Sequence, residues 1–209
     1  TYYSQNGEDI LLSSMFPENH KGFYVDVGAH HPYRISNTYL LHKMGWSGIN
    51  IDPNIETINM FKSARPDDSN VHCGVASAEG SLTYYKFSDP AVNTFSEADA
   101  EPWKKKAWLE FLGTEEVLVK PLQKVLKETL GDKPVQIDVM NIDVEGLDYD
   151  VLRSNDWAKY APKVIVVEAH DFELSNMQNH QTYKFLTNKG YSLKHKVKFS
   201  LIFVKTKKD

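Results

Sequence analysis

Charged residues stand at the ends of several apolar runs along the sequence. Asp26 and Gly28 close the first of these runs, and Asp52 closes the second. Asp143 and Glu168 end two later runs in the same manner. In an open parallel α/β sheet the carboxyl ends of the strands share one edge, and ligands bind there. The sequence therefore predicts one polar site, assembled from several strand ends, that can bind a charged small molecule.

The first two strand ends fit a nucleoside ligand. Gly28 lets the backbone approach a ligand closely, and the start of the next helix favours an anionic group. Asp52, 24 residues after Gly28, ends the second strand, where a carboxylate can accept both ribose hydroxyls. A dinucleotide enzyme would carry G-x-G-x-x-G in the first turn, but here two histidines and Pro32 follow the glycine. Asp26 has no place in that pattern, and a sulfonium cofactor with an ammonium group suits it better.

The elements that position these residues alternate between short strands and amphipathic helices. Strands are expected at residues 22–29, 48–54, 70–77, 80–87, 135–146 and 163–170, with two more between 191 and 205. Helices are expected at residues 36–44, 55–64, 148–157 and 177–189. This alternation predicts an α/β fold with a mostly parallel, doubly wound sheet and an antiparallel C-terminal hairpin. The strand at 80–87 is expected at the edge of that sheet.

Residues 88–120 interrupt the alternation. We expect residues 1–209 to form a single domain in which this segment is an insertion. Long irregular insertions tend to be lids or binding loops, so Trp103 and Trp108 are expected on a mobile lid over the bound acceptor. The alternative is a short helix that the two tryptophans pack against the body of the domain.

The composition is typical of a globular domain with a small-molecule ligand. The formal net charge of −4 offers no basic field for a nucleic acid or an anionic membrane. No run of about 18 apolar residues predicts a membrane span, and the single cysteine, Cys73, excludes an internal disulfide. We therefore expect a soluble, cytoplasmic protein. Thr1 is not a natural start, which leaves open that the chain is one domain of a larger polypeptide.

Five segments carry a more specific signal. They are "SQNGED" at 4–9, "GFYVDVGAHHPYRISNTYLL" at 22–41, "GINIDPN" at 48–54, "NTFS" at 93–96 and "NIDVEG" at 141–146. In this order, over nearly the whole chain, they resemble the FkbM family of S-adenosylmethionine-dependent methyltransferases. The resemblance implies a Rossmann-like class I methyltransferase fold and S-adenosylmethionine as cofactor. It also implies O-methylation of a hydroxyl on a sugar, a glycan or a similar small natural product.

The resemblance assigns cofactor-binding roles to residues in these motifs. They are Gln5 and Glu8 closing over the pocket, Asp26, Gly28 and Ala29 at the methionine end, Asn37 and Thr38 near the carboxylate, Asp52 at the ribose, and Val75 and Ala76 at the adenine. Asp143, at the end of the central strand, is also expected to bind the cofactor. The chain departs from many class I methyltransferases in one respect. His31-Pro32 stands where a further glycine of the first motif is common, so the backbone contacts to the methionine moiety differ.

Methyl transfer to a hydroxyl requires an aligned acceptor and the removal of one proton. We expect His170, just past the fifth strand, to be the base, because an imidazole titrates near neutral pH. Asp143 and Glu168 are expected close by, where they can orient it. His30 and His31 are the competing candidates.

A divalent metal is the alternative means of activating the acceptor. Asp143, Glu168 and Asp171 offer hard oxygen ligands of the kind that Mg²⁺ or Mn²⁺ accepts, and a metal could acidify the acceptor hydroxyl. The spacing of these residues is not distinctive, and none is assigned as a metal ligand.

Two other functions compete with methyl transfer. A domain that binds S-adenosylmethionine or another nucleoside without catalysis has no need for the later carboxylates. A nicotinamide oxidoreductase is disfavoured by the missing glycines. Methylation of a nucleic acid is disfavoured by the acidic balance of the chain and by the absence of a base-flipping motif.

Overall fold

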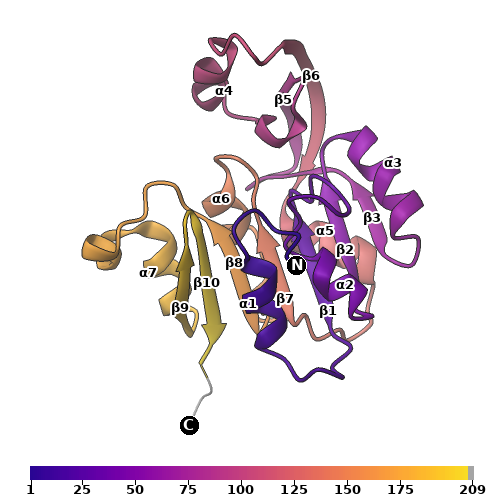
Figure 1. Ribbon diagram of the computed structural model, residues 1–209, viewed down its shortest axis with the longest axis vertical. Coiled ribbons are helices and arrows are strands. Elements are labelled where there is room, and N and C mark those ends of the chain that lie inside the picture. Colours follow the sequence, from indigo (N-terminus) through magenta and orange to yellow (C-terminus); the bar gives the residue numbers. More distant parts are fainter. Residues whose placement is uncertain (207–209) are drawn as a thin grey trace.

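The computed structural model describes residues 1–206 and contains one large sheet and one small one (Figure 1). The large sheet has seven strands in the order β3-β2-β1-β7-β8-β10-β9. Its strands are β1 (Phe23–Val27), β2 (Ser47–Asp52), β3 (Ser69–His72), β7 (Val139–Ile142), β8 (Val164–Glu168), β9 (Tyr191–Val197) and β10 (Ser200–Lys205).

The five strands from β3 to β8 are parallel, and β10 runs antiparallel to both of its neighbours. The strand order reverses between β1 and β7, which makes their carboxyl ends the switch point of the sheet. The predicted fold class is confirmed: a Rossmann-like, mostly parallel sheet that ends in an antiparallel hairpin.

Helices cover both faces of this sheet. They are α1 (Glu8–Ser14), α2 (Tyr39–Lys43), α3 (Ile55–Ala64), α5 (Leu122–Leu130), α6 (Asp148–Arg153) and α7 (Gln181–Asn188), with a 3-10 segment η2 (Leu174–Asn179) before α7. Val25 packs into the core under α5, α6 and α7, whereas its neighbour Tyr24 packs into a second core with α1 and α2. Successive residues of β1 therefore bury opposite faces, as the period of a strand requires.

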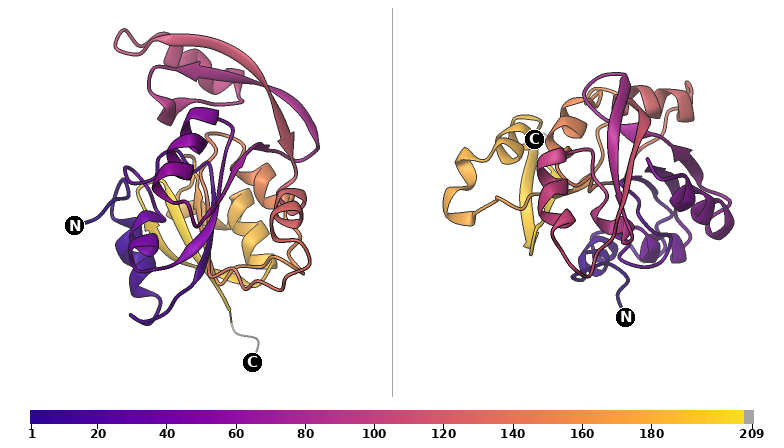
Figure 2. Two further views of the ribbon diagram at one scale, coloured as in Figure 1. Left: turned by 90° about the vertical axis from the view of Figure 1, so that its right-hand side faces the viewer. Right: turned by 90° about the horizontal axis from the view of Figure 1, so that it is seen from above.

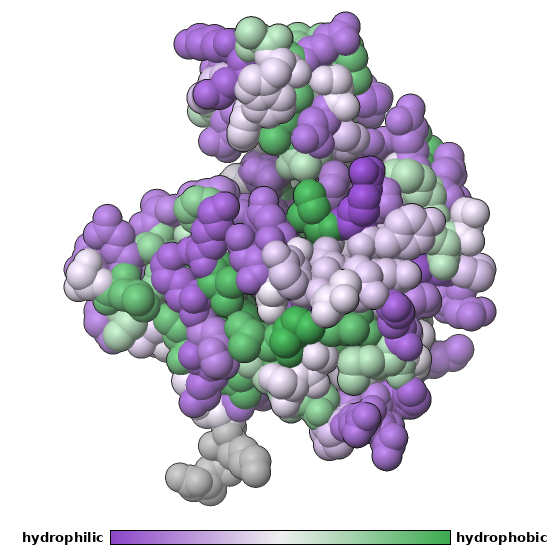
Figure 3. Space-filling view, in the orientation of Figure 1, coloured by the Kyte–Doolittle hydropathy of each residue, from purple (hydrophilic) through white to green (hydrophobic). Residues whose placement is uncertain are grey.

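The small sheet forms an arm that stands apart from the body (Figures 1 and 2). It consists of β4 (Gly74–Val75), β5 (Gly80–Phe87) and β6 (Phe111–Lys120), and the connection from β5 to β6 holds η1 (Pro90–Val92) and α4 (Glu97–Lys104). In the space-filling view the arm is a separate lobe above the body (Figure 3). Its own small core joins Phe87, Ala100 and Leu109, with Trp103 against it.

Two sequence-based strand predictions are wrong in this region. Residues 70–77 were expected to form one strand, but the chain breaks at Cys73 into β3 of the large sheet and β4 of the small one. Residues 80–87 were expected at the edge of the large sheet, but they pair along their length with 111–120. The arm thus begins near residue 74, where β4 follows β3 and pairs with β6, and β5 pairs with the other side of β6.

No helix among residues 1–206 is both long and apolar enough to cross a membrane.

Gly28 determines how closely β1 and β7 meet at the switch point. Its φ is +78°, and a Cβ there would lie 1.7 Å from the carbonyl oxygen of Asp143. The two strand ends are held together by a hydrogen bond from the Asp143 N–H to the Val27 carbonyl, 3.0 Å long. Any side chain at position 28 would push this part of the site open.

We predict that Gly28→Ala destabilises the fold by at least about 3 kcal/mol, the combined cost of a left-handed alanine and a backbone clash. Gly7→Ala is the matched control, since Gly7 is left-handed, with a φ of +91° and a ψ of 15°, and has no atom within 4 Å of the added Cβ. The control should lose only about 1–2 kcal/mol. Urea unfolding measures both, and equal losses would show that the clash is relieved by a small shift of the strands.

Candidate functional site

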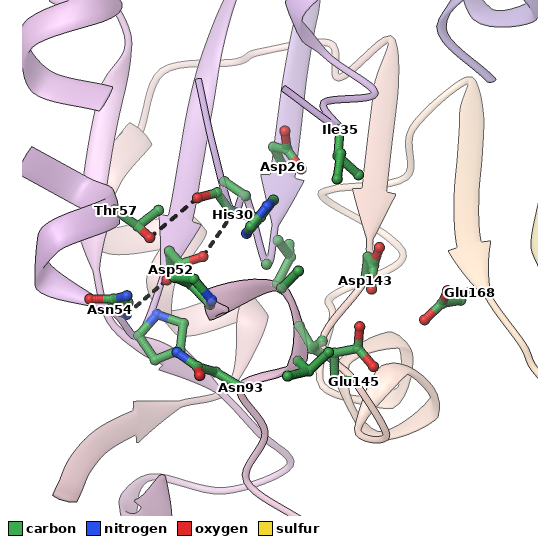
Figure 4. A pocket seen from close by; sticks show the side chains of 18 of the residues that line it. Asp26, His30, Ile35, Asp52, Asn54, Thr57, Asn93, Asp143, Glu145 and Glu168 are labelled. Atoms are coloured by element: carbon green, nitrogen blue, oxygen red, sulfur yellow. Dashed lines mark hydrogen bonds between the residues drawn. The ribbon is translucent and has the colours of Figure 1, made fainter. Parts of the chain in front are cut away.

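A cavity of about 380 Å³ opens at the carboxyl ends of the central strands (Figure 4). The ends of β1, β2, β7 and β8 contribute residues to its wall. The base of the arm adds the segment 89–93, Phe95 and Trp103. The cavity therefore lies at the switch point, where an open α/β sheet binds its ligands.

Asp26 holds the wall of the cavity together at the end of β1. It is 2% exposed, and its two oxygens accept hydrogen bonds from Thr38 Oγ1 at 2.6 Å and Asn141 Nδ2 at 2.9 Å. The Asn141 amide oxygen in turn accepts from Asn37 Nδ2 at 2.9 Å. Burial raises the pKa of Asp26, while the Thr38 and Asn141 hydrogen bonds lower it. The carboxylate thus fixes the positions of two amide side chains that face the cavity.

Asp52 closes β2 and points toward the cavity with His30 and Asn54 beside it (Figure 4). Its oxygens accept from the His30 N–H at 3.0 Å and from the Asn54 N–H at 2.8 Å. Burial raises the pKa of Asp52 to about 6 despite these two bonds. Each carboxylate oxygen keeps a second lone pair, so both can still accept a hydroxyl of a ligand.

Three carboxyl groups crowd the other end of the cavity. Asp143, Glu145 and Glu168 come from the ends of β7 and β8 and face one another (Figure 4). Burial and the nearby Glu168 raise the pKa of Asp143 well above its usual range and the pKa of Glu145 to about 8. Asp148, at the start of α6, has its pKa raised to about 7, chiefly by burial. This end of the cavity therefore favours a positive charge or bound protons.

The loop that carries Glu145 is clamped from the arm. Glu145 has a φ of +50°, and its carbonyl oxygen accepts a hydrogen bond from Thr94 Oγ1 at 2.8 Å. The next residue, Gly146, has a φ of +108°, and a Cβ there would lie 2.4 Å from Asp99 Oδ2 of α4. The base of the arm thus packs on the carboxylate loop, and their positions are linked.

His170 lies at the rim of the cavity beyond β8. Its Nε2 is 3.0 Å from Glu168 Oε2, and its side chain is 60% exposed. The ring also packs against Phe199, with 4.4 Å between the ring centroids. A solvent-accessible imidazole is thus held by a carboxylate on one side and an aromatic ring on the other.

The methyltransferase FkbM domain model matches residues 26–193 of this chain. The chain belongs to the FkbM family. Two solved structures are similar to it. The methyltransferase FkbM from Methylobacillus flagellatus KT is 14% identical with a TM-score of 0.48, and the match covers 90% of this chain and 44% of that one. Precorrin-6y C5,15-methyltransferase from Geobacter metallireducens GS-15 is 12% identical with a TM-score of 0.46, and the match covers 95% of this chain and 87% of that one. The chain thus spans less than half the length of the Methylobacillus flagellatus protein. No curated protein matches it.

Most of the site residues predicted from the sequence line this one cavity. They are Gln5, Asp26, Gly28, Ala29, Asn37, Asp52, Val75, Asp143, Glu168 and His170. The structure thus brings the expected cofactor residues and the expected catalytic residues of the FkbM-family chain to a single continuous space.

Three of the implied cofactor residues lie outside the cavity wall. Glu8 is 1% exposed and accepts from the Asn6 N–H at 2.8 Å and from Ser200 Oγ at 3.1 Å, so it fastens the N-terminal segment. Thr38 is fully buried behind Asp26. Ala76 follows Val75 but does not reach the lining.

The structure does not assemble the metal-ligand set that the sequence suggested. Asp171 does not line the cavity that holds Asp143, and its side chain, which is 84% exposed, lies 3.0 Å from His180 Nε2. Among the described residues a different set, Glu145, Glu168 and His170, has ligand atoms within 4.8 Å of one another.

The two competing histidines differ in their positions. His30 lines the cavity, and burial lowers its pKa. His31 lies outside the lining, and its Nδ1 accepts from the N–H groups of Tyr33 and Arg34. Of the two, only His30 is placed to meet a ligand in this cavity.

Several lining residues were missed or undervalued at the level of sequence. Asn141 carried a usable signal, since it is a polar residue inside an apolar strand. Glu145 was not predicted as a site residue, yet it faces the cavity. Ile35 and Phe199 had no such signal, because their loops reach the cavity only in the folded chain.

We predict that the free energy of unfolding of the FkbM-family protein falls as the pH rises from about 4.5 to about 8, because of Glu145. Its folded pKa of about 8 lies above the usual value, so the folded state binds more protons than the unfolded state in this range. Glu145→Gln should remove part of the loss, roughly 2 kcal/mol at pH 8.5 after allowance for solvent screening. Urea unfolding at several pH values measures it. Glu110→Gln, at an exposed glutamate of the arm, should leave the slope unchanged, and an unaltered slope in Glu145→Gln would contradict the prediction.

Proposed function

We propose that this FkbM-family chain is an S-adenosylmethionine-dependent O-methyltransferase. The observation that carries the proposal is the continuity of the cavity. One space connects Asp52, at the end of β2, with Glu168 and His170, at the end of β8. A nucleoside cofactor held at the first end would have its sulfonium group directed toward the second.

The polar groups fit the two ends of the cofactor. Asp52 is placed to accept the ribose hydroxyls, because a lone pair on each oxygen is free. Asn37 and Asn141, fixed by Asp26, offer amide groups to the amino-acid end. The carboxyl groups of Asp143 and Glu145 favour the positive charge of the sulfonium over the neutral thioether that remains after transfer.

We assign the removal of the acceptor's hydroxyl proton to His170. When bound, the cofactor supplies an electrophilic methyl group, and the acceptor oxygen forms the new bond as the carbon–sulfur bond breaks. His170 Nδ1, the ring nitrogen that does not face Glu168, takes the hydroxyl proton, and Glu168 stabilises the resulting imidazolium through Nε2 at 3.0 Å. The 60% exposure of His170 leaves it accessible to an acceptor that enters from solvent.

The acceptor is proposed to be a hydroxylated small molecule such as a sugar or a glycan. Trp103 of the arm and Phe199 of the C-terminal hairpin both line the cavity. Aromatic rings pack on the apolar face of a sugar while polar groups bind its hydroxyls. Trp108 lies 6.3 Å from Trp103, centroid to centroid, and is 67% exposed, so the arm can extend this surface.

Cofactor binding tests the proposal directly. We predict that Asp52→Ala weakens binding of S-adenosylmethionine at least about tenfold, because charge-assisted hydrogen bonds to the ribose are lost. Asp67→Ala, at an exposed aspartate before β3, is the control and should bind normally. Isothermal titration calorimetry measures both affinities. Equal affinities in the two variants would remove Asp52 from the cofactor site.

The proton acceptor is tested by turnover with labelled methyl donor and a panel of hydroxylated sugars. We predict that His170→Gln lowers kcat by about 10²–10⁴-fold with little change in cofactor affinity. His195→Gln, at an exposed histidine of β9, should keep full activity. Chelator should have no effect on the wild type. Loss of turnover with chelator and its recovery with Mg²⁺ or Mn²⁺ would instead assign the activation of the acceptor to a metal.

A further inference from the structure

The loop between β1 and α2 contains a strained apolar residue. Ile35 has a φ of +52°, a left-handed conformation in which its β-branched side chain is sterically disfavoured. Its side chain is also 51% exposed. Folding alone gains little from such a residue, because it combines backbone strain with apolar surface in water. Conformations of this kind tend to persist at ligand sites.

A buried arginine holds the loop in this shape. Arg65 is fully buried at the end of α3, and its Nε donates to the Pro32 carbonyl at 3.1 Å. Its guanidinium also donates to Ser36 Oγ at 3.1 Å. Pro32 and Ser36 flank Ile35 on both sides, so the backbone between them has few alternatives. The Ser36 N–H is bound as well, to the Tyr3 carbonyl at 3.0 Å.

The side chain of Ile35 is directed into the cavity. It lines the wall together with Ser36 and Asn37, and it hangs between Asp26 and Asp143 in the close view (Figure 4). These two aspartates belong to the ends of β1 and β7, which form the switch point. Ile35 is thus an apolar group fixed over the most polar part of the crevice.

We propose that Ile35 is a cofactor-contact residue that packs on the aliphatic chain of the methionine moiety. The proposal rests on the proposed function. After Gly28 this loop has His31-Pro32 and no second glycine, so its backbone cannot approach a ligand as closely as a glycine-rich turn would. The side chain of Ile35 takes that place. Bound cofactor covers the exposed apolar surface of Ile35, and this contact is the reason that the strained conformation is retained.

Two substitutions separate the strain from the contact. Ile35→Asn tolerates the left-handed conformation but removes the apolar surface. Ile35→Leu keeps an apolar side chain without β-branching. Lys198→Asn is the matched control, because Lys198 has the same φ of +52° in the β9–β10 turn and does not line the cavity.

Affinities for two ligands are measured by calorimetry, together with Tm. S-adenosylmethionine carries the methionine chain, and 5′-methylthioadenosine lacks it. Ile35→Asn should raise the Kd for S-adenosylmethionine about 5- to 30-fold, as expected for loss of a half-exposed isoleucine contact. Its Kd for 5′-methylthioadenosine should stay within about twofold of wild type. Ile35→Leu and Lys198→Asn should bind both ligands as the wild type does. Tm of Ile35→Asn should equal or exceed that of the wild type.

The contrary results are distinct. If Ile35→Asn binds S-adenosylmethionine as tightly as the wild type does, the Ile35 proposal is overturned but the proposed function is not. Equal weakening for both ligands overturns it too, because Ile35 would then act on the nucleoside part or on the fold. A lower Tm in Ile35→Asn but not in Lys198→Asn would make Ile35 a packing residue. A wild-type protein that binds neither ligand would overturn the proposed function as well.

Discussion

The buried guanidinium of Arg65 is the interaction on which the site depends most. A charge without solvent must be bound on all sides, and Arg65 meets this need with the Pro32 carbonyl, Ser36 Oγ and, at 2.9 Å, Thr38 Oγ1. The Thr38 hydroxyl then donates to Asp26, at the end of β1. One buried cation therefore fixes the whole connection from β1 to α2 against the switch point. Its removal would leave several polar groups buried without partners.

The second constraint is the crowding of carboxyl groups at the ends of β7 and β8. Asp143 and Glu145 lie near Glu168, and burial together with Glu168 raises the pKa of both. Backbone hydrogen bonds, such as that from the Gly146 N–H to Asp148, and the Thr94 contact from the arm stabilise the loop in this shape. Such an arrangement is unfavourable in the free protein and becomes favourable when a positive charge enters. The clustered carboxyl groups thus favour the binding of a positively charged ligand and do not stabilise the fold by themselves.

Particular elements show how far prediction from sequence reached. The residues predicted at the strand ends line one cavity, because apolar runs indicate buried strands and the end of a run marks the edge of the sheet. Residues 55–64 were predicted as a helix with these bounds. Strand partners were predicted less well: residues 80–87 have the alternation of an edge strand in any sheet. Their pairing with residues 111–120, and not with a strand of the large sheet, places them in the arm.

The sequence by itself determined the periodicity of the elements, the order of the motifs and the position of Gly28, because these depend on local backbone geometry and on neighbours along the chain. The tertiary structure alone decided which loops reach the cavity. Ile35 and Phe199 lie far apart in sequence and face the same space, and Arg65 acts on residues about 30 positions earlier. Contacts of this kind follow from how helices and strands pack, and a charged residue at the end of a helix gives no sign of which loop it will hold. The physical reason is that hydrogen bonds and charge interactions act through space, whereas sequence patterns record only the direction in which each side chain leaves its own element.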